Sequence, residues 1–225
     1  MNIFDTFDVG WQYAKKYGFG LSLLMLVIFS LICWMTYMCF SSEFWEVYIG
    51  IVKSNDLANI DKLQPYIEEA QTKNWIVSMI QYLLYAGVMN IVVSIYTGET
   101  KGINLKYLSL PFTTYLSVIE YICLMMLLLM VSAYCLFLPF IFFGIRLMFV
   151  IPKILEEPGC SMLKAMRMSW GMTKGRFFDL LGFCLMCMLV MLIGFLCCGI
   201  GACFTSVICM FAFMNIYDII RKQNN

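Results

Sequence analysis

The chain has 225 residues, of which 62% are hydrophobic and 13% charged, with a formal net charge of +1. Soluble domains are about 45–50% apolar and about 25% charged, so this composition excludes a soluble globular protein and requires lipid as a second solvent. The near-neutral charge argues against a nucleic-acid binder, and the lack of histidine removes the commonest metal ligand and general base.

Apolar runs in the first half of the chain have the length that a membrane-crossing helix needs. About 20 helical residues cross a bilayer core of about 30 Å. The first such run covers residues 19–40 and the second covers 75–96. Between them lies a loop, 41–74, with room for one or two short helices. The sequence therefore predicts two spans joined by a loop that is too short for a folded domain.

The second half of the chain contains further apolar runs. The stretch 113–152 is about twice the length of one crossing. It contains Pro139, so we expect a helical hairpin that turns near residues 133–138. The prediction is an all-α, polytopic transmembrane helix bundle of about six spans in one membrane domain (1–225), with the last four spans over 113–133, 137–153, 177–198 and 200–219.

Basic residues predict the orientation of these spans, because lysine and arginine in short loops favour the cytoplasmic side. With six spans and both termini inside, most basic residues fall in inner segments. If residues 113–152 crossed the membrane only once, with a re-entrant half-helix, the chain would have five spans. The most basic loop, residues 153–176, would then lie outside. We therefore expect six spans, cytoplasmic N- and C-termini and, since no other address is recognisable, a bacterial cytoplasmic (inner) membrane location.

Two segments have the pattern of amphipathic helices that lie at the membrane surface. In residues 2–17, Phe4, Phe7 and Trp11 recur at helical spacing. Residues 161–175 place apolar side chains on one face and cations on the other, with Ser161 as a candidate cap. The second helix is either an anchor for the bundle or a contact for lipid head groups or a partner, through Lys164, Arg167, Lys174 and Arg176.

The region around this second helix resembles a pattern shared by a group of bacterial polytopic membrane proteins. In that group an R-L-x-F stretch ends a span, an acidic turn follows, and an S-W-x-x-T-K-G helix leads into the next span. The matching residues are Arg146-Leu147, Phe149, Glu156-Glu157 and Ser169-Trp170 through Thr173-Lys174-Gly175. The group includes YciC-like proteins and the membrane domain attached to some glycerophosphoryl diester phosphodiesterases.

This resemblance covers residues 135–185 well and the rest of the chain only in hydropathy. It implies a fold and a membrane location, and it supplies no catalytic residue, because the group has no assigned activity. We expect no phosphodiesterase domain in this sequence.

Two formal charges, Glu120 and Arg146, lie well inside the apolar runs. A charged side chain at that depth costs at least about 2.5 kcal/mol unless it is compensated. In an antiparallel hairpin the two reach the same level of the bilayer, so we expect an intramembrane pair. One interpretation is structural: the pair holds the third and fourth spans together, or Arg146 extends to the inner head groups instead. The other interpretation is a polar site on a proton or substrate path.

Because no catalytic set is recognisable, we expect a non-enzymatic membrane protein without cofactor or metal. The leading hypothesis is a scaffold, assembly or accessory factor that binds membrane lipid, a membrane protein partner or a second copy of the chain. The alternative is a small transporter or lipid-handling protein that uses Glu120 and Arg146. An enzyme acting on lipid head groups would need a cluster of acids, for which Glu156 and Glu157 offer little.

Overall fold

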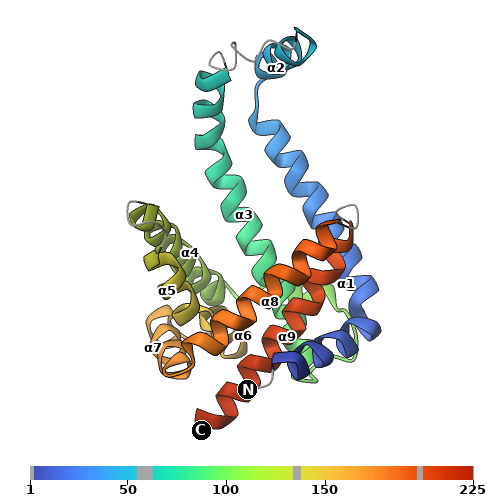
Figure 1. Cartoon of the computed structure of the whole chain (residues 1–225). Helices are drawn as coiled ribbons and strands as arrows, with labels where there is room; N and C mark the ends of the chain where they lie inside the picture. The colour runs from blue at the N-terminus through green and yellow to red at the C-terminus, as the bar shows by residue number, and fades with distance from the viewer. Residues whose placement is uncertain (1–2, 55–62, 134–137, 197–199, 225) are drawn as a thin grey trace. The chain divides into compact units, whose positions relative to one another are not determined.

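The computed structural model describes residues 3–54, 63–133, 138–196 and 200–224, and every regular element within these ranges is a helix (Figure 1). The all-α fold predicted from the sequence is therefore confirmed. The chain divides into two compact units, one formed by Met1–Leu26 with Leu83–Asn225 and the other by Val27–Tyr82. Each unit is described by itself below.

Within the described residues, five helices are long and apolar enough to cross a membrane, which confirms the polytopic character of the chain. They are α1 (Ile3–Cys39), α3 (Gln64–Tyr96), α4 (Phe112–Ala133), α8 (Phe177–Leu196) and α9 (Ile200–Asn224). Their apolar stretches cover the predicted spans 19–40, 75–96, 113–133, 177–198 and 200–219 within the described residues. The predicted hairpin turn near 133–138 lies largely outside the described residues.

The fourth predicted span, 137–153, differs from the expectation, because two short helices replace it. Helix α5 (Leu138–Leu147) has ten residues and α6 (Val150–Glu156) has seven. Ten helical residues rise only about 15 Å, or half of a bilayer core. The helix is interrupted at Phe149, whose ψ is 5° and whose fully buried ring packs on Phe213 and Tyr217 of α9. The interruption between α5 and α6 therefore coincides with contacts to α9. The apolar run in the sequence does not predict it.

The broken segment still runs back along α4. The Tyr121 hydroxyl donates to the carbonyl oxygen of Leu147 over 3.1 Å, and the Ser117 hydroxyl donates to that of Cys160 over 3.2 Å. As residue numbers fall along α4, those of its partners rise, so α5 and α6 lead the chain antiparallel to α4. The α5–α6 segment therefore returns the chain to the end at which α4 begins.

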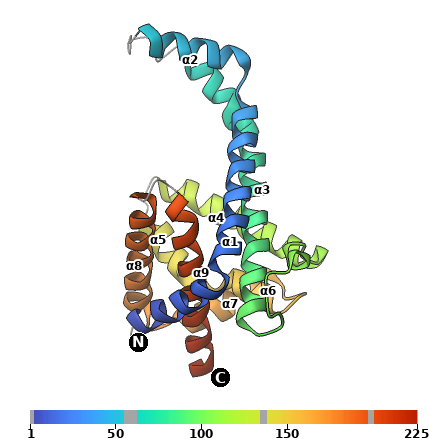
Figure 2. The same cartoon turned by 90° about the vertical axis from the view of Figure 1, so that its right-hand side faces the viewer.

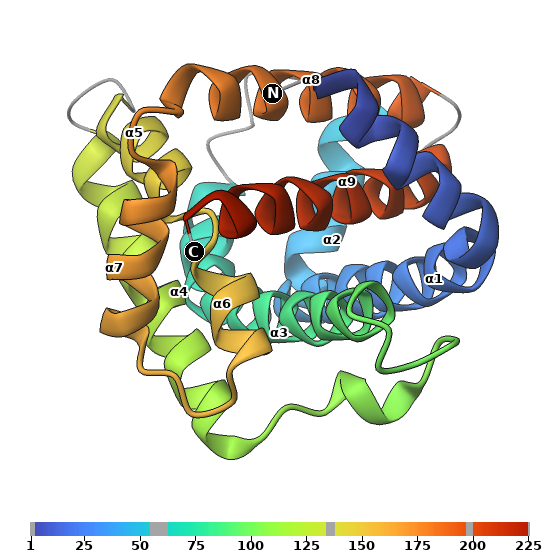
Figure 3. The same ribbon diagram turned by 90° about the horizontal axis from the view of Figure 1, so that it is seen from below.

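The first predicted amphipathic segment, 2–17, is helical from Ile3 on, but no break separates it from the helix that follows. It forms the beginning of the continuous helix α1, which has 37 residues. Its aromatic residues pack on the last two helices, with Phe7 5.5 Å from Phe183 and Trp11 5.9 Å from Phe204 between ring centroids. These rings find partners on α8 and α9, which this part of α1 crosses in Figure 3.

Helix α9 lies at the centre of the first unit, between α8 and the end of α3 (Figure 3). Its side chains Phe211, Ile216 and Ile220 are fully buried. The Tyr96 hydroxyl of α3 donates to the Asn215 side-chain oxygen over 3.0 Å. Figure 2 shows the same helices from the side, with the C-terminal end of α9 beside α6 and α7. The core of this unit thus holds the ends of α6 and α9 close together.

The second unit contains the predicted loop 41–74, which is helical where it is described. Helix α2 (Ser42–Ser54) follows α1, and the Ser41 hydroxyl accepts the backbone N–H of Phe44 over 3.3 Å. Phe44, Ile51 and Leu63 form a small buried core. The side of α2 that carries Phe44 and Ile51 therefore packs within its own unit.

Candidate functional site around helix α7

Helix α7 (Met162–Thr173) occupies the range predicted for the second amphipathic helix. It packs on α4, α5, α6 and α9 and lies crosswise to α8 and α9 in Figure 3. Ser161 stands at the N-cap position, but its side chain makes no capping hydrogen bond. The turn into α8 passes through Gly175, whose φ of +79° is a conformation that glycine adopts at little cost. The helix is thus fixed mainly by its packing.

Two hydroxyls of α7 lie at one backbone carbonyl of α5. The Ser169 hydroxyl donates to the carbonyl oxygen of Arg146 over 2.8 Å. The Thr173 hydroxyl lies 3.4 Å from the same oxygen and 3.0 Å from the Ser169 carbonyl oxygen of its own helix. Ser169 and Thr173 are 1% and 0% exposed. The last four carbonyls of a helix lack intrahelical partners, and Arg146 lies in the last turn of α5. The two hydroxyls therefore supply a bond that the helix end needs.

The side chain of Arg146 lies between aromatic rings. Its guanidinium carbon is 5.5 Å from the centroid of Phe142 and 5.2 Å from that of Trp170 on α7. The Nε and Nη1 atoms are enclosed and have no hydrogen-bond partner. Such cation–π contacts contribute on the order of 1 kcal/mol, but they leave the positive charge without an anion.

The structure does not bring Glu120 and Arg146 together. No ion pair joins them in the described part of the chain, and Glu120 is exposed on α4. The residues of α4 that face the α5–α7 segment are Ser117 and Tyr121. Each residue turns the helix by about 100°, so Glu120 lies roughly 80° around α4 from the middle of this contact. The expected pair is thus replaced by a contact between Arg146 and two rings.

The predicted head-group cations lie on and directly after α7. Lys164 is 3.5 Å from the Glu157 carboxylate. Arg167 and Lys174 are exposed and Arg176 is partly exposed. Among the residues that the structure describes, no carboxylate forms an ion pair with any of these last three. This end of the molecule therefore carries uncompensated positive charge close to Arg146.

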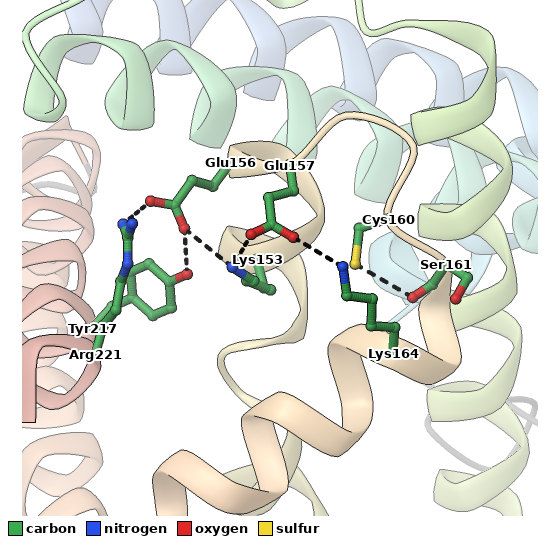
Figure 4. Close-up of polar contacts among 8 residues, drawn as sticks. All are labelled: Lys153, Glu156, Glu157, Cys160, Ser161, Lys164, Tyr217 and Arg221. Atoms are coloured by element: carbon green, nitrogen blue, oxygen red, sulfur yellow. Dashed lines mark hydrogen bonds and ion pairs between the residues drawn. The ribbon is translucent and has the colours of Figure 1, made fainter. Parts of the chain in front are cut away.

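A polar network joins the end of α6 to α9 (Figure 4). The carboxylate of Glu156 accepts a 2.7 Å hydrogen bond from the Tyr217 hydroxyl and forms an ion pair with Arg221. The oxygen that binds Tyr217, Oε2, also lies 3.8 Å from the ammonium group of Lys153, while Arg221 pairs with Oε1. Lys153 is only 4% exposed, so its charge depends on these partners. Glu156 thus connects α6 to α9 through Tyr217 and Arg221.

The neighbouring acid, Glu157, links the same network to α7. It accepts a hydrogen bond from Lys153 over 2.5 Å and lies near Lys164. The hydrogen bond from Lys153 lowers the pKa of Glu157, so its carboxylate stays charged as pH falls further than usual. The network has three cations and two carboxylates (Figure 4) and does not cancel the positive charge of α7.

Sequence reasoning missed most of this network. Lys153 lies three and four residues before the two acids, a spacing that places them on one helical face and was a usable signal. Glu156 contacts Tyr217 and Arg221, which lie 61 and 65 residues further along the chain. No local sequence pattern predicts contacts over such separations. No three His, Cys, Asp or Glu side chains gather as a metal site in the ranges that the structure describes.

The contacts give a physical account of the S-W-x-x-T-K-G pattern. Ser169 binds the Arg146 carbonyl and Thr173 lies against the same carbonyl. Trp170 packs on the Arg146 guanidinium, and Gly175 allows the turn into α8. We call Arg146, Ser169, Trp170 and Thr173 the arginine clasp. The pattern thus fixes α7 to the end of α5 while its cations remain outside.

Comparison with known proteins agrees with this arrangement. The family model described as the membrane domain of glycerophosphoryl diester phosphodiesterase matches residues 107–220, just over half of the chain. No curated protein and no solved structure matches the chain. The matched range contains the whole arginine clasp and extends beyond residues 135–185, where the resemblance is visible by eye. The chain therefore belongs to the family of these phosphodiesterase membrane domains.

Proposed function

We propose that this protein is a non-enzymatic scaffold or accessory factor that binds anionic phospholipid head groups through α7. The observation that carries the proposal is the set of cations without carboxylate partners around the arginine clasp: Arg167, Lys174 and Arg176. The chain is an integral membrane protein, so this helix lies within reach of a lipid surface. Head-group phosphates are the most abundant anions there.

Charge and packing support the proposal together. A basic residue near an anionic lipid surface contributes on the order of 1 kcal/mol. The clasp holds α7 by its buried face, so the cations need not be ordered again when lipid binds. Trp170 is 41% exposed, which suits a ring at the boundary between acyl chains and head groups. A rigid, basic, partly aromatic surface is what a lipid-binding helix needs.

We further propose that this surface faces the cytoplasm of a bacterial cell, with both termini on the same side. The excess of lysine and arginine around α7 favours the cytoplasmic face of a membrane. The end of α9 supports a common side for α7 and the C-terminus, because Arg221 forms an ion pair with Glu156 just before α7. In the scaffold role, a second membrane protein or a second copy binds the bundle.

Anionic lipid should stabilise the full chain in mild detergent more than zwitterionic lipid does. With about 1 kcal/mol for each of three cations, we expect phosphatidylglycerol to raise the thermal midpoint by about 6–12 °C relative to phosphatidylcholine. The variant Arg167→Gln/Lys174→Gln/Arg176→Gln should lose most of this gain. Circular dichroism during heating measures both.

The matched control removes the same formal charge elsewhere, by Lys15→Gln/Lys101→Gln/Lys222→Gln. It should keep most of the phosphatidylglycerol effect, because these lysines lie outside α7. Equal losses in both triple variants would mean that net charge alone attracts the lipid, and the proposed role of α7 would be rejected. A chain that always purifies as a solitary monomer would count against the scaffold role.

The alternative of a transporter built on Glu120 and Arg146 has weaker support. It required the two charges to share a polar site, and Glu120 lies exposed on α4 while Arg146 contacts Phe142 and Trp170. The lipid-binding proposal uses Arg146 where it lies, as positive charge beneath α7.

A further inference from the structure

An open cavity of about 650 Å³ lies in the first unit, away from the arginine clasp. Its walls come from the end of α3, the connecting segment 97–111, the first turn of α4 and the end of α6. The connecting segment includes the short helix η2 (Leu105–Leu108) and is fixed to α3, since the Asn90 side-chain amide donates to the Tyr107 carbonyl over 2.8 Å. Small-molecule sites have volumes of about 300–1,000 Å³, so this cavity can hold a head group.

The cavity is lined mainly by uncharged hydrogen-bonding groups. Apolar side chains such as Val93, Leu110 and Leu155 complete the walls. This mixture suits a ligand with several polar atoms on a short carbon skeleton. The uncharged polar residues are Asn90, Ser94, Thr97, Asn104, Tyr107, Ser109 and Thr114.

One acid and one base in the lining have no ion-pair partner within the described ranges. They are Glu99 and Lys106, both exposed. The other charged lining residue, Glu156, is already bound to Tyr217 and Arg221. The free charges therefore have opposite signs, and a ligand that carries both an anionic and a cationic group complements them.

A buried hydroxyl in the lining also lacks a partner. Thr114, in the first turn of α4, is 2% exposed, and its Oγ1 has no hydrogen-bond partner. A buried polar atom that stays unpaired is destabilising, so a ligand that bonds to it gains affinity. The beginning of α4 also carries the partial positive charge of a helix N-terminus. With Lys106, these groups favour the anionic part of a ligand at this wall.

The cavity lies where two candidate membrane spans meet their connecting segment. The apolar stretch of α3 ends at Tyr96 and that of α4 begins at Phe112. Cavity residues lie on both sides of these ends, from Asn90 to Thr114. This level is that of lipid head groups, because the ends of the apolar stretches mark the ends of the hydrocarbon core.

We propose that this cavity binds the phosphoethanolamine head group of a zwitterionic phospholipid. Lys106, Thr114 and the start of α4 take the phosphate, and Glu99 accepts hydrogen bonds from the primary ammonium. A primary ammonium has three N–H donors for a carboxylate, whereas the quaternary ammonium of choline has none and is typically bound by several aromatic faces. The cavity lining contains one aromatic residue, Tyr107, so it favours the ethanolamine head group.

Native mass spectrometry of the full chain in detergent tests this site with an equimolar mixture of phosphatidylethanolamine, phosphatidylcholine and phosphatidylglycerol. The chain should retain one phosphatidylethanolamine in preference to phosphatidylcholine, besides phosphatidylglycerol bound at α7. In the α7 triple variant, phosphatidylethanolamine should be preferred over both other lipids. Glu99→Gln should lower the preference for ethanolamine over choline about tenfold, because it removes a charge-assisted hydrogen bond. Lys106→Gln should weaken retention of ethanolamine and choline lipids alike, since both carry the phosphate.

The controls Asp8→Asn and Lys101→Gln remove the same charges from exposed positions outside the lining and should change neither preference nor retention. The whole series is repeated in the α7 triple variant. Because the site does not depend on α7, the effect of Glu99→Gln should persist there, so failure of this site and failure of the α7 proposal are distinguishable.

Soluble phosphoethanolamine separates the two sources of this head group. Competition at millimolar concentration would show that the head group alone is recognised. Lipid retention without such competition would show that acyl chains contribute, which still supports the site. Equal retention of ethanolamine and choline lipids by the unmodified chain, or an unchanged preference in Glu99→Gln, would overturn the proposal.

Discussion

Replacing Glu156 by glutamine should lower the thermal midpoint of the full chain in mild detergent by about 5–10 °C. Glu156 holds the end of α6 to α9 through Tyr217 and Arg221 and faces the buried Lys153 (Figure 4). Removing one partner of a buried ion pair costs about 3–5 kcal/mol. Arg221 is 38% exposed, which reduces the expected loss to about 2–3 kcal/mol.

The matched control is Glu69→Gln, which removes an ion pair with Lys73 at 2.8 Å. Both of its side chains are more than half exposed, with 61% for Glu69 and 53% for Lys73, so solvent already screens the pair. The control should leave the midpoint nearly unchanged. A Glu156→Gln midpoint equal to that of the control would show that the network contributes nothing to stability.

The double variant Ser169→Ala/Thr173→Val should release α7 from α5 and lower the thermal midpoint by a similar amount. It removes both hydroxyls that contact the Arg146 carbonyl. An unsatisfied buried carbonyl costs about 1–3 kcal/mol, and the lost hydrogen bonds add about 1 kcal/mol each. We therefore expect a loss of about 2–4 kcal/mol, together with faster proteolysis after the cations of α7.

Ser161→Ala is the control for this variant. Ser161 lies at the N-cap of the same helix but its side chain makes no capping hydrogen bond, so its loss should change neither stability nor proteolysis. The double variant should also bind phosphatidylglycerol less well, since the cations lose their fixed arrangement. If α7 stayed resistant to proteolysis in the double variant, the two hydroxyls would not be needed to hold α7 in place.

The membrane spans were predictable because the signal for each is local. A run of about 20 apolar residues has one low-energy solution in a bilayer, a helix that satisfies its own backbone. The apolar runs from Phe112 and Phe177 begin where α4 and α8 begin. The position of α7 was predictable for the same reason, because its pattern of apolar and basic residues is complete within one helix.

Tertiary contacts decided what the sequence pattern could not. The break at Phe149 accompanies ring packing on α9. Phe7 and Trp11 of early α1 contact rings of α8 and α9. Glu120 and Arg146 lie at the same depth in a predicted hairpin, which suggested that they form a pair. Depth alone does not say which side of its helix a residue is on. Tyr121 rather than Glu120 faces the end of α5.

The most direct test of lipid binding by α7 measures distances between arginine and lipid phosphate. The chain has four arginines, so labelling their guanidinium carbons with ¹³C gives few signals in solid-state NMR of phosphatidylglycerol bilayers. A bidentate arginine–phosphate contact places carbon and phosphorus roughly 4 Å apart. We predict carbon–phosphorus dephasing that falls strongly in Arg167→Gln/Arg176→Gln. Dephasing that is absent from the unmodified chain, or unchanged in that variant, would contradict lipid binding by α7.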